Sequence, residues 1–151
     1  MVKCGGCGDA MSYRYLEHTA DALFEAWGET LEELFSAAAD ALLNVMVEDV
    51  ATIEPKEEVS IRVEHPELDL LLYNFLLELV FFKDARQLLL RVPTVAIAES
   101  GSAYCLAAVA RGERIDRSRH PLLTDVKAVT LHGFTLEKTA TGWRASVLLD
   151  V

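Results

Sequence analysis

The residues best suited to chemistry are two aspartates that lie far apart in the sequence. Asp21 ends the polar tetrad 18–21 between two short apolar segments, and Asp150 ends an apolar run just before Val151. If these segments meet, the two carboxylates and the last main-chain oxygens form an all-oxygen pocket. Oxygen donors suit a hard divalent cation, Ca²⁺ or Mg²⁺, rather than Zn²⁺. The alternative is an ordinary turn whose side chains bond to local backbone N–H groups.

Three further polar residues are candidates for a functional site. Lys127 lies in the alternating segment 125–132, where it is either a positioned cation or an outward-facing strand residue. Glu78 interrupts an apolar run, and a carboxylate there faces water or marks a site because burying it unpaired is costly. His120 belongs to the arginine-rich segment 111–121. That segment is either an anion or partner contact, or a solvated loop with weak local ion pairs.

The sequence does not support an enzyme. It contains no GxSxG elbow, no GxxxxGK[ST] phosphate loop and no HExxH metal motif. Cys4 and Cys7 form one CxxC without a second pair, which is a weak zinc or redox signal. Free thiols in a leader are the simpler interpretation.

Length and charge exclude several classes of protein. The chain has 151 residues, which fits one domain, and its net charge of −10 argues against gripping nucleic acid by bulk electrostatics. Direct nucleic-acid binding would need a local patch of the arginines in segment 111–121. No signal peptide or membrane-spanning run is visible, so we expect a cytoplasmic protein with no membrane partner.

The hydrophobic pattern predicts two helices. Thr30 and Glu33 form a capping box ahead of an amphipathic helix over residues 31–46. Pro66 is expected at the first turn of a second helix, from Glu67 to about Asp84, which is apolar almost all round. Such a helix is either central in the fold or partly covered by a partner.

The rest of the pattern predicts strands. They are expected at residues 13–16, 23–27, 59–64, 87–98, 103–111, 124–136 and 142–151. This order of elements predicts the α+β class, a single layered domain with two helices packed on a largely antiparallel or mixed sheet. Residues 1–12 are expected to form a flexible N-terminal leader, and residues 13–151 the domain.

Several motifs, in order, resemble the archease family. They are the run Tyr13–Asp21, the segment 26–35, the segment 70–84, Ser118–Pro121, Asp125–Thr130 and the final Leu149–Val151. The resemblance extends from Tyr13 to Val151. Two departures are the leader, which lies outside the pattern, and Leu131-His132, where an aromatic residue before the histidine is common.

The resemblance implies an accessory protein without catalytic activity of its own. Archease-like proteins promote guanylylation and multiple turnover of the tRNA-splicing RNA ligase, and have also been associated with a tRNA methyltransferase. The family's Ca²⁺ site corresponds here to Asp21, Asp150 and the backbone oxygen of Val151. Lys127 is the expected functional residue outside the metal site, with His120 and Glu78 as further candidates. The alternative is a general chaperone-like module that binds proteins through the apolar second helix.

Overall fold

The computed structural model describes residues 11–16 and 21–151, which form three layers. Four strands make one antiparallel sheet in the order β1-β2-β8-β7: β1 (Met11–Leu16), β2 (Asp21–Gly28), β8 (Gly142–Asp150) and β7 (Ala128–Thr139). The other strands make a second antiparallel sheet in the order β3-β6-β4, with β5 also paired to β6: β3 (Glu57–His65), β6 (Ala103–Arg114), β4 (Leu88–Arg91) and β5 (Val95–Ser100).

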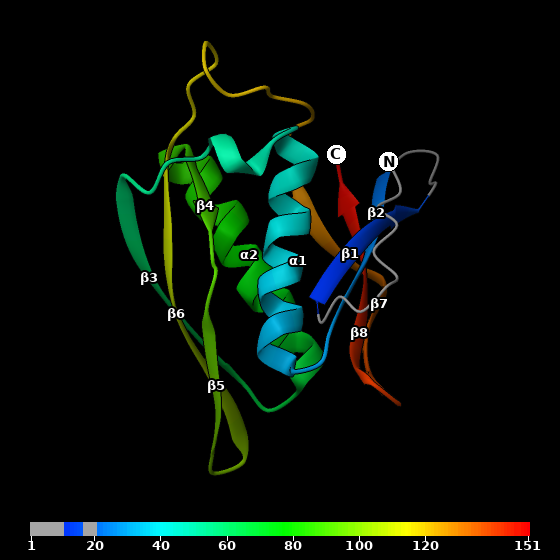
Figure 1. The fold of residues 1–151 in the computed structure, drawn as a ribbon. Helices are drawn as coiled ribbons and strands as arrows, with labels where there is room; N and C mark the ends of the chain where they lie inside the picture. The colour runs from blue at the N-terminus through cyan, green and yellow to red at the C-terminus, as the bar shows by residue number, and fades with distance from the viewer. Residues whose placement is uncertain (1–10, 17–20) are drawn as a thin grey trace.

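Two helices, α1 (Leu31–Met46) and α2 (Leu68–Arg86), lie between the sheets (Figure 1). Helix α1 packs on β1, β2 and β8 on one side and on β4 and β5 on the other, while α2 packs on β3, β4, β6 and β7. The α+β class with two helices is confirmed. The strands divide into two sheets, and the core fills both interfaces with the helical layer.

Helix α1 has the predicted limits, and its N-terminus has the predicted cap. The Thr30 hydroxyl accepts a hydrogen bond from the Glu33 N–H at 3.1 Å, and the Glu33 carboxylate accepts one from the Thr30 N–H at 3.1 Å. These bonds satisfy backbone donors that the first turn would otherwise leave open. The helix is also tied to β4, since Arg91 donates two hydrogen bonds to Asp40.

The position of α2 explains why it is apolar on several sides. Leu71, Leu72, Phe75 and Leu76 are fully buried because the helix meets both sheets. The helix begins at Leu68 with Glu67 as its N-cap, so Pro66 precedes the cap rather than occupying the first turn. A short 3₁₀ helix, η1 (Val50–Thr52), follows α1.

Two predicted strands differ from the structure. The predicted strand 87–98 is divided into β4 and β5 around Pro93, which lacks the N–H that a continuous ladder needs. The strand predicted from Thr124 begins instead at Ala128 and has an irregularity between Thr130 and Thr135. Residues 124–127 are therefore outside any strand and depend on other contacts.

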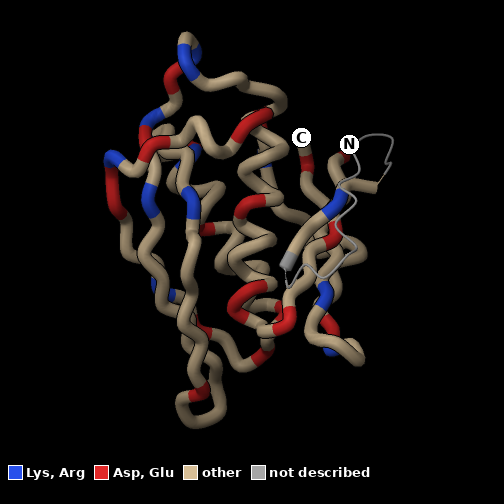
Figure 2. The backbone as a smooth tube through the Cα atoms, viewed as in Figure 1, with Lys and Arg blue, Asp and Glu red and all other residues tan. Residues whose placement is uncertain are grey.

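The described surface is mixed in charge. In Figure 2, acidic residues occur on both sheets and on the helices instead of forming one patch. None of the described helices is long and apolar enough to cross a membrane, and the cytoplasmic location stays a prediction. Strand β1 begins at Met11, and the remainder of the predicted leader, with Cys4 and Cys7, lies outside the described residues.

Candidate functional site

The strand register brings three of the candidate residues to one edge of a sheet. Asp21 is the first residue of β2 and pairs with Asp150, the last residue of β8. Ala128, the first residue of β7, also pairs with Asp150, and the Lys127 N–H donates to the Asp150 carbonyl oxygen at 2.8 Å. We call Asp21, Lys127, Asp150 and Val151 the tip. Residues 18–20 of the predicted tetrad lie outside the described residues.

The two carboxylates of the tip share a face of the sheet. On β2, Phe24 and Ala26 are fully buried, and Asp21 has the opposite parity. On β8, Val147 and Leu149 belong to the hydrophobic core while Leu148 does not, and Asp150 shares the parity of Leu148. Because side chains alternate along a strand, both aspartates lie on the face away from the helices.

This arrangement suits a shared cation. Like charges directly opposite in a sheet are destabilising, and their Cβ atoms lie about 4.5–5.5 Å apart. A hard divalent ion between Asp21 and Asp150 would be attracted by both, and both donors are carboxylate oxygens of the kind that Ca²⁺ and Mg²⁺ prefer.

The protein side chains supply only part of a coordination shell. Within residues 11–16 and 21–151, no three His, Cys, Asp or Glu side chains gather in a way that could hold a metal ion. A cation at the tip therefore needs main-chain oxygens, such as that of the half-buried Val151, together with water. Asp150 and Lys127 are exposed, which leaves room for water or a partner group. The donor set fits a hydrated hard cation better than a closed cage.

Glu78 and His120 do not belong to the tip. Glu78 is half-buried about halfway along α2, away from the end of the helix that contacts residues 125 and 126. His120 is 3% exposed and takes part in a separate polar cluster. Both were candidates of the sequence analysis, and the structure places them in different surroundings from Asp21 and Asp150.

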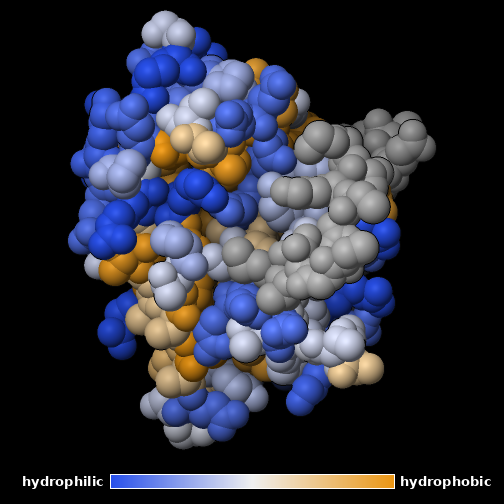
Figure 3. Space-filling model, viewed as in Figure 1, coloured by the Kyte–Doolittle hydropathy of each residue, from blue (hydrophilic) through white to orange (hydrophobic). Residues whose placement is uncertain are grey.

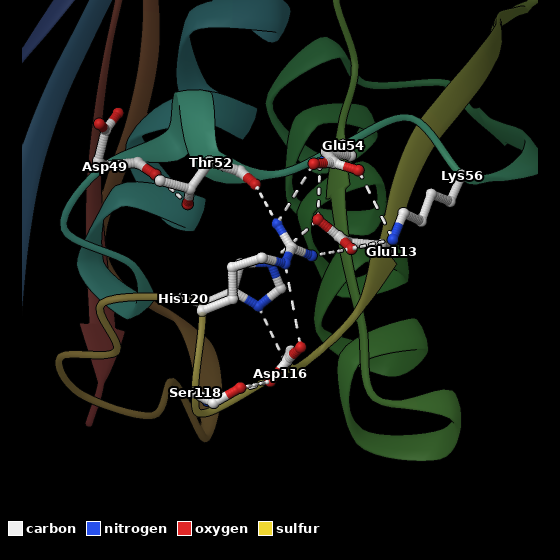
Figure 4. Close-up of polar contacts among 9 residues, drawn as sticks. Asp49, Thr52, Glu54, Lys56, Glu113, Asp116, Ser118 and His120 are labelled. Atoms are coloured by element: carbon white, nitrogen blue, oxygen red, sulfur yellow. Dashed lines mark hydrogen bonds and ion pairs between the residues drawn. The ribbon is translucent and has the colours of Figure 1, made fainter.

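That separate cluster, which we call the buried network, centres on Glu113 (Figure 4). The Glu113 carboxylate is 4% exposed and accepts hydrogen bonds from the Glu54 N–H at 2.8 Å and from the Arg119 guanidinium. Arg119 also donates to the Thr52 carbonyl oxygen at 3.0 Å. The segment 111–121, interpreted from the sequence as a partner contact or a solvated loop, thus carries two buried polar side chains, Glu113 and His120, whose polar atoms have hydrogen-bond partners.

The environment holds Glu113 in its charged form. The hydrogen bond from Arg119 is the main cause that lowers its pKa well below the ordinary value of 4.5. Burial opposes this shift, while the Glu54 N–H and His120 reinforce it. The neighbouring Gly112 allows the backbone of β4 to lie close against β6, since a Cβ there would lie 1.8 Å from the Leu89 carbonyl oxygen.

The hydrogen bonds of His120 assign its tautomer. Its Nδ1 lies 2.9 Å from the Asp116 N–H and must accept, so the proton is on Nε2, which lies 3.1 Å from Glu113 Oε2. Both ring nitrogens of this neutral histidine therefore have a hydrogen-bond partner within the protein. This arrangement anchors the loop after β6 and leaves the ring without a lone pair for a substrate.

Lys83 is a residue that sequence reasoning missed. It lies near the C-terminal end of α2, is 5% exposed, and bonds Asp125 Oδ1 at 2.7 Å and the Val126 carbonyl oxygen at 2.8 Å. A third bond goes to Asp84. The only signal in the sequence is a lysine directly after an apolar helical run, which normally indicates a helix end meeting water.

The structure also bears on two alternative functions. Of the loop arginines, Arg119 pairs with Glu113, and Arg111 pairs with Glu58 at 3.0 Å, so part of the proposed basic patch is neutralised. The apolar second helix expected to bind clients is largely internal, although Phe81 is 55% exposed.

Apolar surface occurs elsewhere. In Figure 3, apolar areas appear over β4 and β5, broken by polar side chains. A shallow cleft of about 550 Å³ lies over β5 and β6, with Pro93, Ala96 and Val109 in its lining. These residues are small or isolated, and the cleft lies away from the tip.

Known proteins match this chain over nearly its whole length. Archease of Methanosarcina mazei is 39% identical over 140 residues, covering 92% of this chain and 95% of that protein. Archease of Pyrococcus abyssi is 39% identical over 140 residues, covering 92% and 98%.

Solved structures share the fold. The solution structure of Methanobacterium thermoautotrophicum protein 1598 has a TM-score of 0.81 and 34% identity, covering 94% of this chain and 99% of that chain. The crystal structure of a Thermotoga maritima archease, described as a possible chaperone, has a TM-score of 0.62 and 22% identity, covering 90% and 94%, and supports the fold alone. Residues 13–151 match the Archease protein family (MTH1598/TM1083). With that match and these relatives, the chain belongs to the archease family.

Proposed function

We propose that this protein is an accessory activator of the tRNA-splicing RNA ligase, promoting its guanylylation and multiple turnover with a divalent cation bound at the tip. Family membership supports the ligase as partner, because archease-like proteins act on it. The observation that carries the cation is the register that sets Asp21 opposite Asp150. Ca²⁺ is the expected ion, with Mg²⁺ as the alternative hard cation.

The tip has the chemistry that a nucleotide-transfer partner needs. When bound, the cation supplies positive charge for phosphate oxygens. Asp21 and Asp150 hold that cation, and the exposed Lys127 presents a second cation from the neighbouring strand start. The activator contributes these groups while the ligase retains the reacting side chain. No catalytic residue is assigned to this chain.

The experiment is reconstitution with a purified RNA ligase of this class, guanosine triphosphate and a broken tRNA substrate. The protein should raise both the fraction of guanylylated ligase and the number of products formed per ligase. Asp21→Asn should remove the stimulation, whereas Glu99→Gln, an exposed acid on β5, should retain it.

Two results would count against parts of the proposal. A ligase that responds equally with and without the wild-type protein would overturn the activator function, and a tRNA methyltransferase would then be the next partner to test. A folded Asp21→Asn protein with full stimulation would remove the cation from the mechanism and leave the activator function in place.

A further inference from the structure

Lys83 is a buried cation whose three donors are all used. An ammonium group has three N–H bonds, and here they meet Asp84, Asp125 Oδ1 at 2.7 Å and the Val126 carbonyl oxygen at 2.8 Å. Burial pulls its pKa down, but the hydrogen bonds that Lys83 donates to Asp125 and Asp84 outweigh burial and raise it. Lys83 is therefore charged and held in one geometry.

A charge at this place needs a reason. The preceding turn of α2 contains Leu79 and Val80, which are 6% and 5% exposed, so an apolar side chain could continue the packing at lower cost. The partner carboxylates are largely in water, with Asp84 57% and Asp125 66% exposed. Two exposed acids gain little from one buried lysine, whereas the bond to a main-chain carbonyl fixes backbone.

The backbone that Lys83 fixes connects the core to the tip. On one side, the Leu123 N–H donates to the Met46 carbonyl oxygen at 2.8 Å. On the other side, the Lys127 N–H donates to the Asp150 carbonyl oxygen at 2.8 Å. Residues 125 and 126 lie between these two anchors, before the ladder of β7 begins at Ala128. Lys83 supplies the hydrogen bonds that a strand partner would supply elsewhere.

We propose that Lys83 is a positioning residue of the tip: by holding Asp125 and the Val126 carbonyl oxygen, it sets where Lys127 lies relative to Asp21 and Asp150. The expected effect of Lys83 on cation binding rests on the proposed function, whereas its expected effect on the backbone does not. Residues that hydrogen-bond directly to metal ligands typically contribute about 10- to 100-fold in affinity. Lys83 bonds no proposed ligand and acts through residues 125–127, so the lower end of that range is expected.

The test compares Lys83→Met with Arg86→Met in otherwise intact protein. Arg86 is an exposed cation on the same helix and pairs with Glu57 at 3.6 Å, so it controls for loss of a positive charge there. Calcium titration by calorimetry should show about tenfold weaker binding for Lys83→Met and unchanged binding for Arg86→Met. Lys83→Arg, which keeps the charge, should recover part of the affinity.

A second measurement is hydrogen exchange at the Lys127 amide. Its bond to Asp150 should open more often in Lys83→Met, so its exchange should accelerate about tenfold relative to amides in α1. Asp125→Asn, at an exposed position, gives the same comparison if Lys83→Met does not fold.

The outcomes separate the two proposals. Unchanged Lys127 exchange in a folded Lys83→Met or Asp125→Asn protein would overturn the positioning role. Faster exchange in a protein whose wild type binds neither Ca²⁺ nor Mg²⁺ would support the positioning role and overturn the cation of the proposed function.

Discussion

The tip and the buried network are both built from acidic and basic side chains, but they leave those side chains in opposite states. Glu113 is enclosed and has a hydrogen-bond donor on each of its oxygens. Asp150 and Lys127 are exposed at the edge of a sheet. Polar groups whose hydrogen bonds are all made within the protein stabilise its structure, whereas groups exposed to water are available to bind a ligand. Of the two regions, the tip is the one suited to a ligand.

Of the two regions, the buried network has more of the features that usually indicate a reactive site. It contains a buried histidine beside a carboxylate with a lowered pKa, a combination that often marks catalytic residues. Structural ion pairs produce the same sign. The deciding observation is that the Asp116 N–H occupies the remaining ring nitrogen of His120.

The largest expected effect is on stability, from Glu113→Ala. Removing the Glu113 carboxylate leaves the Glu54 N–H and the buried His120 Nε2–H without their acceptor, and each buried donor left unsatisfied costs about 1–3 kcal/mol of the free energy of unfolding. Urea denaturation measures the loss. Glu58→Ala, which removes an exposed acid 3.0 Å from Arg111, is the matched control and should cost less than about 1 kcal/mol. Equal losses from the two variants would mean that the network is no more than a surface ion pair.

The next effect is stabilisation by the cation at the tip. Calcium at a hundred times its dissociation constant should raise the free energy of unfolding by about 2.7 kcal/mol. Thermal unfolding with and without calcium measures this gain, and Asp150→Asn should abolish it while Glu99→Gln retains it. A calcium-dependent gain that persists in Asp150→Asn would place the ion elsewhere.

The decrease in the free energy of unfolding at acid pH should depend on Glu113. Its folded pKa is lower than its unfolded value near 4.5, so its contribution is complete above that pH and declines as pH falls toward the folded pKa. Within this window each pH unit costs up to about 1.4 kcal/mol. Glu113→Gln should therefore be less stable than wild type at neutral pH, but below pH 4.5 its free energy of unfolding should change less with pH. Parallel pH profiles would contradict the lowered pKa.

The smallest effect on stability is expected for Lys127→Met. Substitutions at exposed positions usually change the free energy of unfolding by less than about 0.5 kcal/mol. Ligase activation should nevertheless fall about tenfold or more, since hydrogen bonds to charged groups contribute about 1.5–3 kcal/mol. Ligase guanylylation measured beside urea denaturation separates these effects. Full activation by Lys127→Met would remove Lys127 from the functional surface.

Local patterns in the sequence were the most reliable guide to the fold. Helix α1 was predicted with its limits because Thr30 and Glu33 lie three residues apart and need no distant partner. Division of the strands into two sheets depends on pairings such as that of β2 with β8, for which strand patterns give no direct signal. The break at Pro93 was visible in the sequence, but the apolar run around it favoured one strand.

The candidate site, like the fold, could be predicted from the sequence only in part. Asp21, Asp150 and Lys127 were chosen mainly because ordered motifs resemble a family, and the structure brings them to one edge. The cation itself stays a prediction. The burial of Glu113 and Lys83 was not foreseen, because their partners Glu54 and Asp125 are 59 and 42 positions away along the chain. No periodic pattern in one segment signals such pairings.

The pairing of Asp21 with Asp150 has a consequence for protein synthesis. The first of these residues leaves the ribosome early, and the second only with β8. Closing so long a loop is entropically costly, and non-local strand pairing is slow. A nascent chain without β8 therefore has no tip, however well its first helix is formed. The tip forms only after β8 has been made and paired with β2, so a partner that recognises it will ignore fragments truncated before β8.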